Sequence, residues 1–133
     1  MNYSVEVKNT KTSKGRGCFA TKDFKKGEII EECPILLLTI KECDLCEKTL
    51  LDCYIYAWNK KFGAILLGYG FIYNHSYTPN AIYVRDYKNK LMVYKTIKPI
   101  KRGEEICVNY NGRPNNKQKI DWLGFQKKWK RLQ

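Results

Sequence analysis

A glycine-containing loop near the start of the chain has the spacing of a nucleotide-binding motif. Gly15-Arg16-Gly17-Cys18-Phe19-Ala20 fits the pattern G-x-G-x-x-A, which needs a helix that crosses over to a parallel strand. Such a crossover takes at least about 10–12 residues, and only six residues lie between Ala20 and Gly27, where the next turn falls. We therefore exclude a dinucleotide site. The glycines mark a place where the backbone approaches a ligand or a neighbouring strand closely.

The only histidine lies in a second run of polar residues, Asn74-His75-Ser76-Tyr77-Thr78-Pro79-Asn80. One histidine excludes a His-rich metal site, but it can serve as a general base, a buried hydrogen-bonding group or a surface residue. Pro79 fixes a turn and the amides can bond the backbone, so we expect a buried loop held by side-chain amides. A third run, residues 103–110, predicts a turn followed by a strand that ends in Tyr110.

Thiol chemistry is the other possibility that the composition offers, since the chain has six cysteines. Four of them could form a zinc site, although a single Cys-x-x-Cys pair is only half of the usual signal. The chain opens without an apolar signal segment, which predicts an intracellular location and reduced thiols. We expect thiols packed as small hydrophobic groups and no metal. A zinc-bound interaction module remains an alternative, with the ligands Cys33, Cys43, Cys46 and Cys53.

Short strands must position these residues. Brief extended runs separated by turn residues are typical of a mainly β domain, and 133 residues are enough for one domain. No apolar run approaches the roughly 20 residues of a membrane helix. The expected strands are 5–7, 18–20, 28–31, 35–39, 54–58, 64–67, 82–84, 91–94 and 106–108, with an irregular or helical insert at 43–52.

The last 21 residues differ from the rest and predict an amphipathic helix that packs on the same domain. We divide the chain accordingly, into a domain at 1–112 and a basic C-terminal helix at 113–133. Asn116 is a suitable N-cap, and Gly124 lowers the helix propensity. The apolar face is formed by Trp122, Phe125, Trp129 and Leu132, at helical spacing.

Charge is distributed unevenly along the chain, which carries a net charge of +12. Residues 113–133 have a net charge of +6, whereas residues 28–52 have a net charge of −5. A basic surface attracts polyanions such as nucleic acid, and an acidic one suits a basic peptide. A solvated surface without a partner is equally compatible with either segment.

Together, three of these motifs resemble the signature of the SET-domain lysine methyltransferases. They are Lys14–Gly17, the Asn74-His75-Ser76 run with Pro79 and Asn80, and Glu104-Glu105-Ile106 with Tyr110. The resemblance extends from about Val5 to Gly112, and the runs 51–58 and 68–73 are similar to small stand-alone viral and bacterial members. It implies a β-clip SET fold with short helices and a pseudoknot-like threading near the active site.

The resemblance also implies a cofactor, S-adenosylmethionine, and a role for each matching residue. Tyr110 is the implied catalytic residue, at the end of a substrate-lysine channel lined by Tyr54, Tyr83 and Tyr110. An aromatic channel favours the neutral amine that attacks the methyl group. A tyrosine at position 83 is expected to limit the product to monomethyl-lysine. The implied cofactor-binding residues are Lys14, Gly15, Arg16, Gly17, Asn74, His75 and, stacked on the adenine, Trp122.

The expected partner is a protein or peptide carrying a lysine, for which a histone is one candidate. The acidic insert at 41–53 is where we expect the substrate to dock. The alternative is a catalytically weak SET-like module that binds nucleic acid or nucleosomes through its basic tail. Apolar residues on the tail leave a homodimer open. We expect the cytoplasm, or a host nucleus if the chain is viral or an effector.

Overall fold

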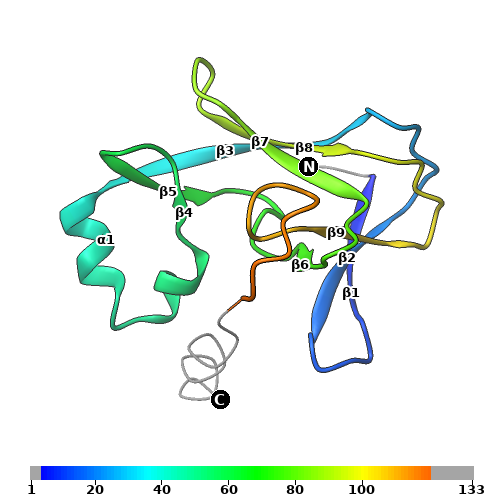
Figure 1. Ribbon diagram of the computed structural model, residues 1–133, viewed down its shortest axis with the longest axis horizontal. Coiled ribbons are helices and arrows are strands. Elements are labelled where there is room, and N and C mark those ends of the chain that lie inside the picture. The colour runs from blue at the N-terminus through cyan, green and yellow to red at the C-terminus, as the bar shows by residue number, and fades with distance from the viewer. Residues whose placement is uncertain (1–3, 121–133) are drawn as a thin grey trace.

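The structure is a computed structural model that describes residues 4–120, and its main elements are two β-sheets (Figure 1). The smaller sheet has the strand order β1-β2-β9-β6. Its strands are β1 (Val5–Asn9), β2 (Arg16–Ala20), β9 (Glu105–Val108) and β6 (Asn74–His75). The glycine-containing run therefore enters a strand and not a helix, which confirms the exclusion of a dinucleotide site.

The larger sheet has the order β4-β5-β3-β8-β7. One 11-residue strand, β3, replaces the two separate strands that we expected at 28–31 and 35–39. Its first half pairs with β8 up to Pro34, and its second half pairs with β5 from Ile35 onward. Pro34 has no N–H to donate, and it stands where the pairing changes sides. The other strands are β4 (Tyr56–Ala57), β5 (Phe62–Leu66), β7 (Ala81–Asp86) and β8 (Leu91–Thr96), beside β3 (Ile29–Thr39).

The insert after β3, which we expected to be irregular or helical, is helical, and it projects at one side of the molecule (Figure 1). It consists of the helix α1 (Ile40–Cys46) and the 3-10 helix η1 (Leu50–Tyr54). Thr39 and Glu42 form a capping box at the start of α1. No residue of α1 or η1 is buried, so both present their charges to solvent.

A parallel pairing between β6 and β9 joins the middle of the chain to its end. Asn74 is opposite Cys107, and His75 is opposite Val108. The Asn80 side chain donates to the carbonyl of Glu105 at 2.8 Å and accepts from the N–H of Cys107 at 2.9 Å. These bonds confirm that amides hold the loop. The two segments lie side by side as the predicted threading requires, although β6 was not expected to be a strand.

The core lies between the sheets and contains two stacked tyrosines. Tyr73 and Tyr94 are fully buried, with ring centroids 4.3 Å apart. Cys18 and Cys33 are also fully buried, and burial raises the pKa of both thiols far above the usual range. These two cysteines therefore pack as the small hydrophobic groups that we expected. Within residues 4–120, no helix has the length and apolarity needed to cross a membrane.

The segment that follows β9 folds back on the middle of the chain. The Asn109 side chain donates to the Asn116 carbonyl at 2.7 Å, and the Tyr77 hydroxyl donates to the Gln118 carbonyl at 3.2 Å. Residues 113–120 are not helical, so the expected helix start at Asn116 is wrong. The side-chain bonds from Asn109 and Tyr77 hold this segment in a non-helical conformation. The predicted apolar face, including Trp122, lies outside the described residues, and the division at residue 112 stays a prediction.

Candidate active site

Asn74 connects the glycine-containing loop to β9. Its amide nitrogen donates to the carbonyl of Arg16 at 3.0 Å and to the Glu105 carboxylate at 2.7 Å. A Cβ atom on Gly17 would lie 2.9 Å from that nitrogen and 2.5 Å from the carboxylate oxygen. Only glycine permits so close an approach. The loop is therefore held against the Asn-His motif, the two segments that the family resemblance assigns to one cofactor site.

Lys14 provides a second connection between the same two segments. Its ammonium group donates to the carbonyl of His75 at 3.0 Å. Gly15 has φ = +77°, a left-handed conformation that glycine adopts without strain. Lys14 and Arg16 are both exposed, so two cationic side chains flank the loop. The structure thus brings six of the seven predicted cofactor residues to one place. The seventh, Trp122, lies outside the described residues.

His75 is a buried link between β6 and the end of β9. Its side chain is 5% exposed, and its Nδ1 atom accepts a 3.0 Å hydrogen bond from the backbone N–H of Tyr110. Desolvation, and then the charge of Lys14, lower the pKa of the imidazole. A neutral ring with Nδ1 as acceptor carries its proton on Nε2. His75 therefore positions Tyr110, and its Nδ1 is not available as a base.

Tyr110, whose backbone is bonded to His75, also forms a hydrogen bond with its side chain. Its hydroxyl donates to the backbone carbonyl of Tyr73 at 2.7 Å. Burial, and to a smaller extent the neighbouring Tyr56, raise the pKa of Tyr110 well above its usual value. The side chain is therefore a neutral phenol at physiological pH. Its proton is donated to Tyr73, so its lone pairs are what it can offer to a bound group.

A cavity of about 450 Å³ lies beside Tyr110. The structure brings all three predicted channel residues, Tyr54, Tyr83 and Tyr110, to its wall. Tyr54 packs against Phe71 with ring centroids 5.2 Å apart, and burial raises the pKa of both Tyr54 and Tyr83. The wall is therefore aromatic and largely uncharged. The full lining is Cys53, Tyr54, Ile55, Tyr56, Ala57, Phe71, Tyr83, Arg85, Tyr110, Asn111 and Gly112.

Tyr56 belongs to this wall, and the sequence interpretation did not single it out. Its hydroxyl donates to the Gly70 carbonyl at 3.2 Å and lies 3.1 Å from the Tyr94 hydroxyl. Its ring meets Tyr83 edge to face, with centroids 5.3 Å apart. Alternation of Tyr54 and Tyr56 in the sequence was the available signal. Tyr83 is in turn tied to Tyr110, because its hydroxyl donates to the Tyr110 carbonyl at 3.2 Å.

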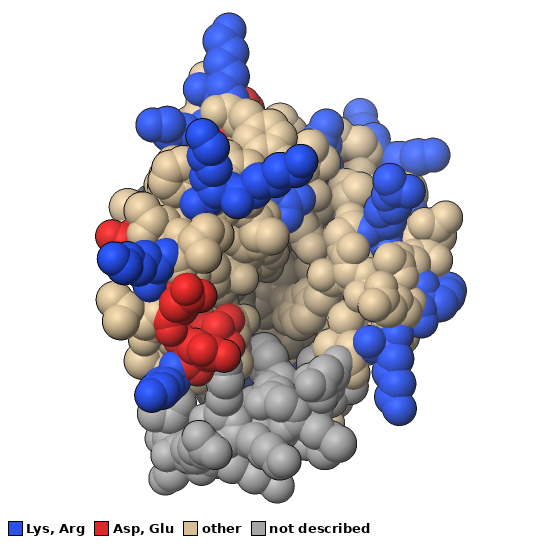
Figure 2. All heavy atoms as spheres, turned by 60° about the vertical axis from the view of Figure 1, so that its left-hand side comes forward, with Lys and Arg blue, Asp and Glu red and all other residues tan. Residues whose placement is uncertain are grey.

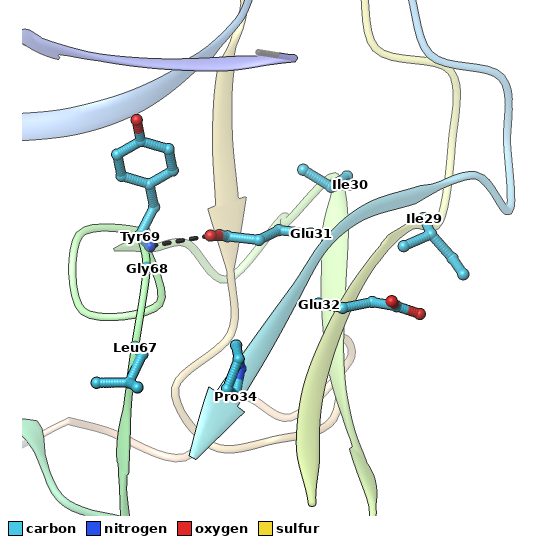
Figure 3. Close-up of a pocket in the computed structure, with 8 residues that line it drawn as sticks. All are labelled: Ile29, Ile30, Glu31, Glu32, Pro34, Leu67, Gly68 and Tyr69. Carbon is cyan, nitrogen blue, oxygen red and sulfur yellow. Dashed lines mark hydrogen bonds between the residues drawn. The ribbon is translucent and has the colours of Figure 1, made fainter. Parts of the chain in front are cut away.

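A buried carboxylate, Glu31, supports the segment that leads to Tyr73, and its hydrogen bond with Tyr69 is drawn in Figure 3. It is 9% exposed and accepts a 2.8 Å hydrogen bond from the Tyr73 hydroxyl and a 3.0 Å bond from the Tyr69 N–H. Gly68, at φ = +96°, faces the same carboxylate, and a Cβ there would clash with it. The sign of this role in the sequence is an acidic residue next to the apolar pair Ile29-Ile30 of an expected strand.

The face that carries α1, β4 and β5 is hollowed, and its charges are segregated (Figure 2). Acidic side chains gather at one edge of the hollow, while Lys and Arg side chains lie above it. The exposed acids of α1 and its C-cap are Glu42, Asp44 and Glu47. The cavity's lining residues Cys53 and Tyr54 belong to η1, which follows α1 directly. The acidic insert therefore borders the cavity.

The model of the SET domain matches residues 15–111, which is more than half of the chain. The chain belongs to the SET-domain family. A Schizosaccharomyces pombe relative named histone-lysine N-methyltransferase, H3 lysine-37 specific, is 33% identical over 107 residues, covering 80% of this chain and 72% of the relative. The crystal structure of a provisionally named histone methyltransferase of Plasmodium falciparum has a TM-score of 0.68 and 29% identity, covering 83% of this chain and 95% of that one.

These matches confirm the predicted fold and the predicted enzyme class, a SET-type protein-lysine methyltransferase. The zinc-module alternative gains no support. In the part of the chain that the structure describes, no three His, Cys, Asp or Glu side chains are grouped to hold a metal ion. All six cysteines, including Cys33, Cys43, Cys46 and Cys53, are free thiols.

Proposed function

We propose that this SET-domain protein transfers a methyl group from S-adenosylmethionine to the side-chain amine of a histone lysine, and that monomethyl-lysine is its main product. The observation that carries the proposal is the convergence at Tyr110. Asn74 holds the glycine-containing loop, His75 holds the Tyr110 backbone, and the Tyr110 hydroxyl reaches Tyr73. Segments from three parts of the chain thus meet beside one aromatic cavity.

The donor set beside Tyr110 fits the amino-acid part of this cofactor. Both hydrogens of the Asn74 amide are engaged within the protein, so its carbonyl oxygen is what it can offer to an ammonium group. The cationic side chains of Lys14 and Arg16 suit a carboxylate. When bound, the cofactor supplies an electrophilic methyl group on a sulfonium. The lone pairs of the Tyr110 hydroxyl can hold a polarised methyl through weak C–H···O contacts.

The cavity supports the other reactant, a lysine amine. Methyl transfer needs a neutral amine, whereas a free lysine has a pKa of about 10.4. The aromatic wall disfavours the ammonium form by desolvation and so lowers that pKa. Alignment of the two reactants can contribute about 7–11 kcal/mol of barrier reduction. The chain's contribution is therefore mainly positioning and desolvation, and Tyr110 is a positioning donor and acceptor rather than the base.

Tyr83 supports the proposed product. Its side chain is 7% exposed, lines the cavity and donates to the Tyr110 carbonyl. Its oxygen keeps lone pairs that can accept a hydrogen bond from a lysine amine. A phenol held at that place also occupies space that a second or third methyl group would need.

The substrate class rests on charge and on the relatives. The acidic insert at the cavity's border favours a basic peptide, and the names of both relatives refer to histones. Histone tails are rich in lysine and arginine, so electrostatic attraction would raise their association rate. Such a substrate implies an intracellular site of action. The labelling experiment below identifies which lysine is methylated.

The test is incubation of the full chain with isotope-labelled S-adenosylmethionine and separate core histones. We expect label on one histone lysine with the wild type and about a hundredfold loss of kcat with Tyr110→Phe. Tyr87→Phe is the matched control, since its hydroxyl also donates to a backbone carbonyl, that of Trp58, and it does not line the cavity. Equal activity of the Tyr110 and Tyr87 variants, or no transfer by the wild type, would overturn the proposal.

A further inference from the structure

Two neighbouring turns present four exposed lysines. Lys60 and Lys61 belong to the turn between β4 and β5, and Lys88 and Lys90 belong to the turn between β7 and β8. We name these four residues the hairpin patch. Among residues 4–120, the ion pairs are Lys8–Glu6 and Lys22–Glu28, so no lysine of the patch forms an ion pair there.

The two turns are joined rigidly. The Arg85 side chain donates to the Ala57 carbonyl at 2.8 Å, and the Tyr87 hydroxyl donates to the Trp58 carbonyl at 3.2 Å. The Trp58 and Tyr87 rings also pack edge to face, with centroids 5.0 Å apart. The lysines therefore stand on one fixed platform, and the platform costs little ordering entropy when a ligand binds.

The hairpin patch lies next to the channel. Ala57 and Arg85, which connect the two hairpins, both line the aromatic cavity. Figure 2 shows Lys and Arg side chains above the hollow, on the side away from the acidic edge. Asp86 is the one acid in these two turns, and hydrogen bonds from Asn89 lower the pKa of its carboxyl. One carboxylate against the four lysines leaves the two turns with a net positive charge.

A second group of basic residues, at the other end of the molecule, differs in this respect (Figure 1). The loops 22–28 and 98–104 carry six cationic residues, but Asp23, Glu28 and Glu104 are interspersed among them. Glu28 forms an ion pair with Lys22 at 2.8 Å. These loops are joined by the bridge between Phe24 and Ile100. They are therefore rigid and basic as well, yet partly neutralised and remote from the cavity, which makes them a natural control.

We infer that the hairpin patch binds the phosphate backbone of duplex nucleic acid, and that it thereby favours protein substrates presented on nucleic acid. Unpaired lysines on a rigid platform are what backbone phosphates contact, whereas lysine is depleted at protein–protein interfaces. The first half of the inference is independent of catalysis, and the second half rests on the proposed function. The nucleic-acid contact considered in the sequence analysis was through the basic tail at 113–133. The hairpin patch is a separate surface, formed by other residues.

The binding test uses the full chain and a fluorescent 20-base-pair DNA duplex. We expect binding whose affinity falls about 100-fold between 50 and 200 mM salt, as about four phosphate contacts require. Replacing Lys60, Lys61, Lys88 and Lys90 by Gln should weaken binding at least about tenfold and flatten the salt dependence. The matched control replaces Lys25, Lys26, Lys98 and Lys101 by Gln, which removes the same charge, and should lower the affinity by less than about threefold.

Equal losses in the two quadruple variants would show that net charge alone is responsible and would overturn the inference. Competition by poly-glutamate as strong as that by DNA would assign the patch to acidic proteins instead, which also overturns it. In the catalytic test, the patch variant should lose the preference for nucleosomes over free histone but keep its rate on the free histone. Failure of the wild type on free histone would count against the proposed function, while the DNA measurement would still decide the binding surface.

Discussion

The hydroxyl of Tyr110 donates a 2.7 Å hydrogen bond to the backbone carbonyl of Tyr73, a residue 37 positions earlier in the chain. The bond fixes the direction of the phenol's lone pairs, because its only proton is committed to Tyr73. The hydroxyl of Tyr73 is in turn held by Glu31 at 2.8 Å. One side chain, that of Tyr73, thus connects Tyr110 to a buried carboxylate that does not itself line the cavity.

Replacing that carboxylate tests the connection. We expect Glu31→Gln to lower kcat about tenfold with little change in KM for the peptide. The amide keeps one acceptor oxygen, but its NH2 group then faces the other donor, either the Tyr73 hydroxyl or the Tyr69 N–H. Steady-state kinetics together with a thermal melt would check this. Glu32→Gln, an exposed neighbour, is the control and should match the wild type. If KM rises and kcat is kept, Glu31 does not act through Tyr110.

The product prediction concerns Tyr83. We expect Tyr83→Phe to shift the product from monomethyl-lysine toward di- and trimethyl-lysine, because it removes a hydroxyl from the wall of the cavity. Loss of its bond to the Tyr110 carbonyl should cost about 1 kcal/mol of stability. Mass spectrometry of the methylated peptide measures the distribution. Trimethyl-lysine from the wild type, unchanged in the variant, would contradict the prediction.

The third prediction is a pH dependence that originates at His75. The pKa of its imidazole is lowered from 6.5 in the folded protein, so the unfolded chain takes up the proton first as the pH falls. The stability that His75 contributes should be complete above pH 6.5 and decline below it. Thermal melts between pH 7.5 and 5.5 should show the decline. In His75→Asn, whose amide oxygen can accept from the Tyr110 N–H without titrating, the decline should be smaller.

Gly17 makes a steric prediction. Its missing side chain lets Asn74 and Glu105 approach, so Gly17→Ala forces them apart and should cost about 1–3 kcal/mol of stability. Affinity for S-adenosylmethionine, measured by calorimetry, should fall as well, because Asn74 would move. A variant with wild-type stability and unchanged cofactor affinity would refute the close contact.

The acidic insert makes a prediction about substrate binding. The double variant Asp44→Asn with Glu47→Gln should raise KM for a basic peptide severalfold and leave kcat unchanged, since both side chains are exposed on the insert whose residue Cys53 lines the cavity. The effect should disappear at high salt. Glu32→Gln with Glu104→Gln removes the same charge from other exposed positions and serves as the control. Equal effects of the two pairs would argue against docking at the insert.

Local patterns in the sequence predicted most strands and much of the candidate site. Alternating or apolar runs placed β1, β2, β5, β7, β8 and β9, because these signals are local. The continuity of β3 through Pro34 was not predictable, since it depends on which neighbour each half pairs with. β6 has two residues and forms only through pairing with β9.

One physical reason explains why the sequence interpretation missed two residues of the site. Glu31 and Tyr56 act through partners far away in the chain, and neither lies in a motif of its own. Asn74, His75 and Tyr110 were found because they lie in motifs. Helix periodicity predicted a tail helix from Asn116, but side-chain bonds to Asn109 and Tyr77 determine the backbone as far as residue 120.

The parallel pairing of β6 with β9 has a consequence for biosynthesis. Strand β6 can acquire this neighbour only after residue 108 has left the ribosome, and Tyr110 follows directly. Pairings of such long sequence separation form slowly. A nascent chain that already contains the glycine loop and the Asn-His motif thus has no finished cavity. Activity should therefore appear only after the segment that carries β9 and Tyr110 has been synthesised and has paired with β6.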